Sequence, residues 1–240
     1  MIPLLLAWAT TAQAWSVEEV QTRLSEVAGH RRLRLQREAP AVSEPELRKV
    51  VAGAVVTGTR DATMGSKAYG AAILSVGLPT LWAALNDETR HPGYTAVAYS
   101  ELLEGRVCHS GRRVLQYLPV PFITDRWWIG VLTANAGVRS ASGGSVRELA
   151  FDSLTDPALV KSPGGREMIQ SAQPIGFSRG AWFLVALDER STYVEYYVHT
   201  DPGGKIPGSM ASRFASRGVR ENIEAIQRFA KEVRPSCPIE

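Results

Sequence analysis

One short stretch of the sequence has the residue types and spacing of a catalytic nucleophile. Gly176-Phe177-Ser178-Arg179-Gly180 matches G-x-S-x-G, the pattern in which lipases and esterases hold their reactive serine. That chemistry needs a helix directly after the serine, and further along the chain an acid and then a histidine. Here Ala181–Leu187 reads as a strand, and Asp188 and His199 lie at the two ends of one strand segment. We therefore interpret Ser178 as a turn residue between two strands.

The remaining polar residues predict no catalytic site, no metal and no cofactor. The four histidines are scattered through predicted loops and strand ends, and no cysteine or histidine has the spacing of a zinc site. Cys108 and Cys237 fit either an oxidised pair in an exported protein or two unrelated thiols. The basic cluster His30-Arg31-Arg32-Leu33-Arg34 is short and carries no aromatic residues, which favours a solvated face over a nucleic-acid site.

The N-terminus has the pattern of an export signal. An apolar run from Ile2 to Ala9 precedes the small-x-small triplet Ala12-Gln13-Ala14, and we expect cleavage after Ala14. No Lys or Arg precedes the run, so a buried N-terminal segment or a misplaced start is the alternative. A bilayer span needs about 20 apolar residues, and no later stretch approaches that length. The expected location is therefore periplasmic or extracellular.

The first third of the sequence predicts helices around a pair of strands. A chain of 240 residues buries roughly 70–75% of the surface of its extended form, so a sizeable core needs no external support. Ser16-Val17-Glu18-Glu19 has the form of a capping box for a helix reaching Gly29, and Ser43-Glu44-Pro45-Glu46 marks a second helix start. Strands are predicted over 54–60 and 68–76. Leu78–Asp87 follows as a helix whose apolar residues share one face.

The middle of the chain reads as an antiparallel meander, because short turn signals separate segments rich in Val, Tyr, Trp and Thr. The predicted strands cover 95–104, 107–118, 126–139, 145–153, 181–187 and 192–200. A long helix begins near Pro207, and its apolar stripe from Val219 to Val233 is out of phase with Met210 and Phe214. We expect a kink or break at Ser216-Arg217-Gly218.

Four stretches in this order resemble the START (StAR-related lipid-transfer) domains and their SRPBCC, or Bet v 1-like, relatives. They are Leu78–Asp87 "LPTLWAALND", Leu118–Trp128 "LPVPFITDRWW", the strand pair around Gly180-Ala181-Trp182 and Thr192–Tyr196, and the turn Asp201–Pro207 "DPGGKIP". The resemblance implies an α+β helix-grip fold, in which a curved antiparallel sheet wraps a long C-terminal helix. It divides the chain into a signal peptide (1–14), an N-terminal helical extension (15–49), a START-like domain (50–233) and a tail (234–240).

The resemblance also implies a function without catalysis. A protein of this kind binds a lipid or other apolar molecule in an internal tunnel and touches a membrane surface transiently. The expected tunnel-lining residues are Tyr99, Tyr117, Trp128, Arg139, Trp182, Tyr197, Met210, Phe214 and Ile223. Strand alternation puts Glu195 on the less core-like face of its strand, so we expect it to be solvent-exposed, and an inward position is the alternative. Arg126 is expected to have a structural role. A polyketide cyclase-like or aromatase-like enzyme is the alternative, and sterol, phospholipid, fatty acid and isoprenoid ligands all stay open.

Overall fold

The computed structural model of the protein describes residues 15–204, 208–234 and 237, with the backbone alone over 208–214. The predicted signal peptide, residues 1–14, lies outside this part of the chain. The helices and 3-10 turns are α1 (Val17–Glu26), η1 (Ala28–Leu33), α2 (Glu44–Val51), α3 (Leu78–Leu85), η2 (Glu88–Arg90), α4 (Ala136–Ala141), η3 (Pro157–Leu159), α5 (Pro163–Gln170) and α6 (Gly208–Ala230). The strands are β1 (Val56–Arg60), β2 (Ser66–Leu74), β3 (Tyr99–Glu104), β4 (Arg112–Leu118), β5 (Arg126–Ala134), β6 (Val146–Leu154), β7 (Gln173–Pro174), β8 (Phe177–Ala186) and β9 (Thr192–Asp201).

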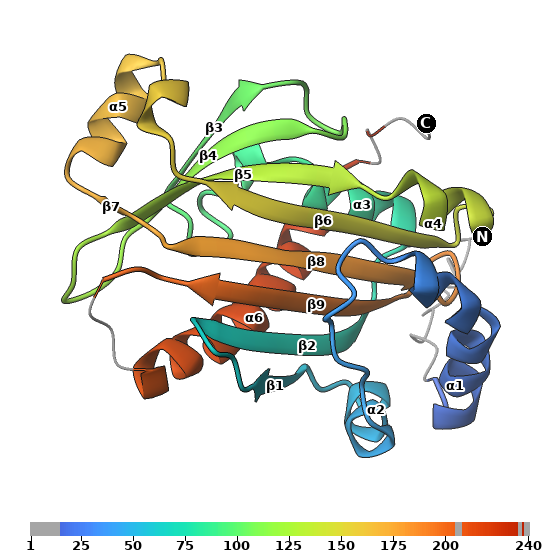
Figure 1. Ribbon diagram of the computed structural model, residues 1–240. Coiled ribbons are helices and arrows are strands. Elements are labelled where there is room, and N and C mark those ends of the chain that lie inside the picture. The colour runs from blue at the N-terminus through green and yellow to red at the C-terminus, as the bar shows by residue number, and fades with distance from the viewer. Residues whose placement is uncertain (1–14, 205–207, 235–236, 238–240) are drawn as a thin grey trace, which may run out of the picture.

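The strands form one curved sheet in the order β1-β2-β9-β8-β6-β5-β4-β3, and the short β7 pairs with β5 (Figure 1). All neighbours are antiparallel except β5 and β7. Helix α6 crosses one face of this sheet, while the N-terminal segment with α1 and α2 lies over the other face (Figure 1). The predicted α+β helix-grip arrangement is confirmed.

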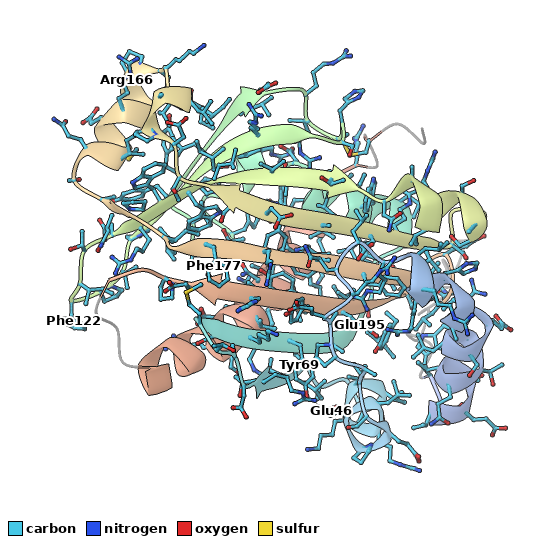
Figure 2. All side chains as sticks on the ribbon, viewed as in Figure 1. Glu46, Tyr69, Phe122, Arg166, Phe177 and Glu195 are labelled. Atoms are coloured by element: carbon cyan, nitrogen blue, oxygen red, sulfur yellow. A yellow bond between two sulfur atoms is a disulfide. The ribbon has the colours of Figure 1, made fainter. Side chains whose placement is uncertain are left out.

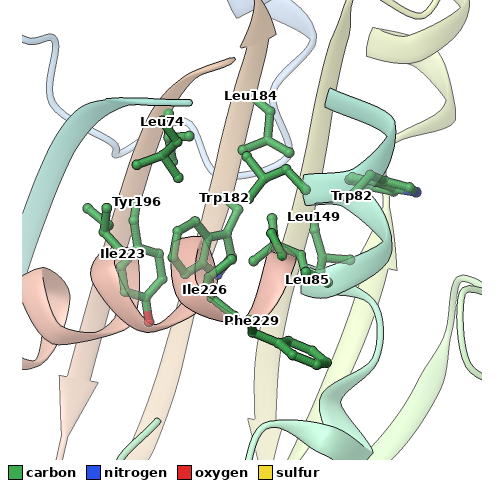
Figure 3. Packing of buried hydrophobic residues seen from close by; sticks show 14 of the residues in the cluster. Leu74, Trp82, Leu85, Leu149, Trp182, Leu184, Tyr196, Ile223, Ile226 and Phe229 are labelled. Carbon is green, nitrogen blue, oxygen red and sulfur yellow. The ribbon is translucent and has the colours of Figure 1, made fainter. Parts of the chain in front are cut away.

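The main core lies between the sheet and α6. Side chains from β2, β6, β8 and β9 pack there against α3 and α6 (Figure 3). Trp182 and Tyr196 stack at the centre, with ring centroids 4.1 Å apart. Gly70 in β2 lets α6 approach this closely, because a Cβ atom there would lie 2.6 Å from Val219 Cγ1. The helix therefore packs against the β2 backbone itself.

Two smaller cores cover the opposite face of the sheet. One packs α1 and α2 against β2, β8 and β9, and includes Val20, Leu47 and Phe183. The other packs β4 and β5 against the segment around η3 and α5, and includes Trp127 and Val160. The sheet is therefore buried on both faces along much of its length, which explains why its central strands are apolar on both sides.

Four local expectations differ from the structure. The strand expected over 126–139 ends at Ala134, because the Asn135 side chain accepts a hydrogen bond from the Val138 N–H at 3.1 Å and starts α4. The strand expected from Val107 begins at Arg112, and the one expected from Ala181 begins at Phe177. Of the kink or break expected at Ser216-Arg217-Gly218, the break is wrong, since α6 runs continuously from Gly208 to Ala230.

Candidate ligand pocket

A pocket of about 400 Å³ opens between the sheet and the N-terminal half of α6. Its walls come from the β4–β5 loop, the facing side of β5, the ends of β8 and β9, and one side of α6. Most of the lining groups are apolar. The lining residues are Ala96, Leu118, Pro119, Val120, Pro121, Ile123, Arg126, Trp128, Ile175, Ser178, Thr200, Pro202, Ala215, Arg217, Gly218 and Glu221.

The β4–β5 loop at the pocket mouth is held from within by Asp125. Its carboxylate accepts hydrogen bonds from the Val120 N–H at 2.9 Å and from the Tyr117 hydroxyl. The hydrogen bond from Tyr117, and after it the one from Val120, lowers the pKa of the Asp125 carboxyl group. The bond to Asp125 also raises the pKa of the Tyr117 hydroxyl. The base of the loop is therefore fixed, while its tip is apolar and bare. Phe122 is fully exposed there and Ile123 is 40% exposed, and Figure 2 shows Phe122 at the far end of the loop.

Arg126 joins this loop to the segment that leads into α6. Its guanidinium donates to the Thr124 carbonyl on one side, and to the carbonyls of Pro202 at 2.6 Å and Gly203 at 3.3 Å on the other. Arg126 is buried and all these acceptors are neutral. A buried guanidinium that bonds several carbonyls fixes their relative positions. These contacts agree with the structural role expected for Arg126. Its side chain holds two sides of the pocket mouth together.

Ser178 lies inside β8 and lines the pocket, so the expected turn position is wrong. It pairs with Thr200 of β9, and its N–H donates to Ser153 Oγ at 2.7 Å. The histidine nearest in sequence, His199, points to the other face, where its Nε2 lies 2.9 Å from the Met64 carbonyl oxygen. Among the described lining residues there is no histidine. Ser178 therefore lacks a neighbouring histidine base among the described residues that line the pocket.

Two buried carboxylates, Glu148 and Glu195, lie on the face of the sheet opposite the pocket. Glu195 accepts two hydrogen bonds from Arg31, at 2.9 and 2.5 Å, and one from Arg34 at 2.9 Å. Glu148 accepts from the Leu35 N–H at 2.8 Å and from Asn135 Nδ2 at 2.6 Å. Both carboxylates are therefore satisfied by the N-terminal segment and by α4.

Two expectations about these charges need correction. The cluster from His30 to Arg34 is a solvated face only in part: Arg32 is exposed, but Arg34 is 5% exposed and its guanidinium lies 4.5 Å from the Phe183 ring centroid. Glu195 is on the expected side of β9, away from Val194 and Tyr196, but it is buried rather than exposed. The sequence of β9 alone does not reveal that the N-terminal segment covers this face.

The expected tunnel-lining residues fall into four groups. Trp128 lines the pocket, whereas Trp182 and Ile223 face α6 and are buried in the main core. Tyr99, Tyr117 and Tyr197 point to the opposite face, where their hydroxyls bond Glu101, Asp125 and Glu38. Arg139 lies on α4, beyond the end of β5 and away from the pocket. The side chains of Met210 and Phe214 lie outside the described residues.

The expectation from the sequence put all three tyrosines on the wrong face of the sheet for one reason. An antiparallel strand alternates its faces, and aromatic side chains occur on both faces when both are covered. Burial with Glu38 as neighbour raises the pKa of Tyr197 to about 12. The lining residues that the sequence did not single out, such as Ile175 and Ala215, are small or common apolar residues. Among the described residues, the expected lining residue that pointed to this part of the molecule was Trp128.

A disulfide joins Cys108 in the β3–β4 turn to Cys237 beyond α6, with Cα atoms 5.2 Å apart. Of the two alternatives for these cysteines, the structure therefore has the oxidised pair. No cluster of His, Cys, Asp or Glu in the described residues could hold a metal ion. The helices in that part of the chain are all too short or too polar to cross a membrane.

Comparison with known proteins gives the fold and little more. No family model and no curated protein matches the sequence. Among solved structures, the STAR-related lipid transfer protein from Xanthomonas axonopodis has a TM-score of 0.59 and 18% identity, covering 74% of this chain and 93% of that one. Human StAR-related lipid transfer protein 5 has a TM-score of 0.60 and 13% identity, covering 91% and 99%. Human STARD10 has a TM-score of 0.59 and 12% identity, covering 83% and 84%. The chain therefore has the helix-grip fold of START domains.

Proposed function

We propose that this protein binds a lipid-like apolar molecule in the pocket between the β4–β5 loop and α6, and carries it without changing it chemically. The pocket itself is the main support, since its wall is mostly apolar and its volume of about 400 Å³ lies within the range of ligand sites. Each Å² of apolar surface that leaves water when a ligand enters contributes roughly 25 cal/mol to the free energy that favours binding. The solved structures of like fold include proteins described as lipid transfer proteins, which agrees with this reading.

The polar groups of the pocket favour binding over catalysis. Arg126 is bonded to loop carbonyls, and Arg217 Nε donates to Glu221 Oε1 at 2.6 Å. Proton transfer needs an acid or base that is free to reach the substrate. Among the described lining residues, these three are the ones that carry charge, and each is engaged with another group. A cyclase-like reaction therefore has less support than carriage of a ligand.

The bare loop tip supports transient contact with a membrane. Phe122 and Ile123 are exposed at the pocket mouth, beside Pro119 and Pro121. An aromatic side chain that enters the bilayer interface gains the free energy of leaving water. Contact at this position would place the mouth of the pocket against the membrane from which a ligand is taken. The ligand would then pass between membrane and pocket without crossing water.

We also propose that the protein is exported. The disulfide between Cys108 and Cys237 supports an oxidising compartment, because cytosolic thiols are kept reduced. The apolar run before Ala14 agrees with this location. Both observations suit a carrier that works outside the cytosol, in the periplasm or beyond the cell.

A pocket-filling variant tests the binding proposal. Ala215→Trp places an indole in the wall of the pocket, and we expect it to weaken binding of the neutral dye Nile red at least tenfold. Arg220→Trp is the matched control, since Arg220 lies on the same helix but is exposed and pairs with Glu224. Circular dichroism establishes that both variants are folded. Equal dye binding by a folded Ala215→Trp variant and the wild type would contradict the proposal.

A further inference from the structure

Three polar side chains form a row across neighbouring strands next to the pocket. Ser100 of β3 pairs with Gln116 of β4, and Gln116 pairs with Trp128 of β5. Residues directly opposite one another in antiparallel strands project from the same face of the sheet. Trp128 lines the pocket. The row Ser100–Gln116–Trp128 therefore faces the same side as the pocket.

The packing of the flanking residues confirms this orientation. Leu102, two positions after Ser100, and Val114, two positions before Gln116, both belong to the main core under α6. A Cβ atom built on Gly130 would lie 3.8 Å from Gln116 Oε1 and 3.4 Å from the core residue Leu132. Gly130 thus leaves its side-chain space empty beside the Gln116 amide.

Among the described residues, Ser100 brings a buried polar atom to the row, while Gln116 and Trp128 are half-buried. Ser100 Oγ is buried and makes no hydrogen bond. Within the part of the chain that the structure describes, no other group bonds the Gln116 amide or the Trp128 indole N–H. Buried polar groups are normally paired, and an unpaired one is unfavourable by the free energy of its lost hydration. One buried hydroxyl without a partner and two half-buried polar side chains, one of them lining the apolar pocket, fit a bound molecule with a polar group of its own.

The chemistry of the row indicates an uncharged group. Serine, glutamine and tryptophan supply hydrogen bonds but no charge. The nearest cation of the pocket, Arg126, donates to backbone carbonyls at the pocket mouth, and Glu221 is paired with Arg217. A phosphate or carboxylate bonded to the row would meet no charged group within the row itself, and burying it unpaired is strongly unfavourable.

We infer that the ligand is a neutral lipid whose hydroxyl, carbonyl or amide group bonds the row Ser100–Gln116–Trp128 while its apolar part fills the pocket. This inference rests on the proposed ligand pocket and makes it more specific. The row selects between apolar molecules by the presence of a polar group, since one net hydrogen bond changes affinity by about 3- to 10-fold.

Displacement of Nile red by 1-decanol and by undecane tests the inference, because the two differ only by a methyl in place of the hydroxyl. In Gln116→Leu we expect the decanol-to-undecane affinity ratio to fall about 3- to 10-fold, with undecane binding as well as before or better. Ser100→Ala should lower the same ratio. Gln170→Leu, an exposed site on α5, is the matched control and should leave it unchanged.

The possible outcomes separate this inference from the pocket proposal. Binding of dye and both compounds with an unchanged ratio in Gln116→Leu and Ser100→Ala would overturn the polar row and leave the pocket standing. Tighter binding of decanoate than of 1-decanol at neutral pH would overturn the choice of a neutral group. Failure of the wild-type protein to bind the dye or either compound would overturn both proposals.

Discussion

The buried ion cluster on the sheet face opposite the pocket gives a stability prediction whose size follows from its contacts. Glu195 accepts three hydrogen bonds from Arg31 and Arg34 and a fourth from the Tyr193 hydroxyl at 3.0 Å. Figure 2 shows Glu195 on β9 beneath the N-terminal segment. Glu195→Gln keeps the shape of the side chain but removes the charge that both arginines face.

The expected loss is large because the cations stay buried. The Glu195 carboxylate is 6% exposed, Arg34 is 5% exposed and Arg31 is 29% exposed. Removing one partner of a buried ion pair lowers the free energy of unfolding by about 3–5 kcal/mol. Glu38→Gln is the control, since that carboxylate is half exposed and lies 3.1 Å from Lys67 Nζ. An exposed pair contributes about 0–1 kcal/mol.

Urea unfolding followed by tryptophan fluorescence measures both variants, and its pH dependence adds a second check. Burial alone would raise the pKa of Glu195, but the hydrogen bonds and charges of Arg31 and Arg34 outweigh it, so the pKa is lowered. A carboxyl group whose pKa is lower in the folded state stabilises the fold above its unfolded pKa of about 4.3. The difference in the free energy of unfolding between wild type and Glu195→Gln should therefore be constant from about pH 6 to 8. It should narrow as the pH falls through the folded pKa.

Two results would refute this reasoning. A loss below about 1 kcal/mol in Glu195→Gln, equal to that of Glu38→Gln, would mean that the buried cations do not depend on this carboxylate. A gap that widened toward acid pH would mean that the folded pKa is raised rather than lowered.

Three further perturbations have defined outcomes. Phe122→Asp should lower affinity for neutral phosphatidylcholine vesicles by about 10-fold or more in a flotation assay, because burial of a Phe side chain contributes about 1.5–3 kcal/mol, while dye binding in solution stays unchanged. Gly70→Val should lower the free energy of unfolding by more than about 2 kcal/mol in urea titration, since its Cβ would lie 2.6 Å from Val219 Cγ1 and 2.9 Å from the Val56 carbonyl oxygen. Cys237→Ser should lower the thermal midpoint, because the disulfide closes a loop with a sequence separation of 129, for which chain entropy predicts about 5 kcal/mol; an unchanged midpoint in oxidised protein would contradict it.

The sequence predicted the order of the elements because local patterns encode them. The capping boxes at Ser16 and Ser43 are present, and the strand alternation of β9 correctly put Glu195 on the face away from Val194, Tyr196 and Val198. As expected, β9 ends at Asp201 and the long helix α6 is described from Gly208 onward. These features depend on near neighbours in the chain, which a single sequence contains.

The candidate site was less predictable because it depends on contacts between distant segments. The aromatic residues Tyr99 and Tyr117 were expected in the tunnel, but α5 and the loop residue Asp125 cover or bind them on the other face. Arg34 and Glu195 are far apart in sequence, and neither pattern alone predicts that they meet. The pocket itself is lined by residues whose types are common in any core, so only their assembly distinguishes them.

Native mass spectrometry of the protein, purified from its own host and followed by solvent extraction, tests the central claim most directly. We expect one neutral, polar-headed apolar molecule per chain, lost or reduced in the Ala215→Trp variant and retained in Arg220→Trp. A protein that emerges empty and takes up neither Nile red nor 1-decanol would contradict the claim that this pocket carries a lipid.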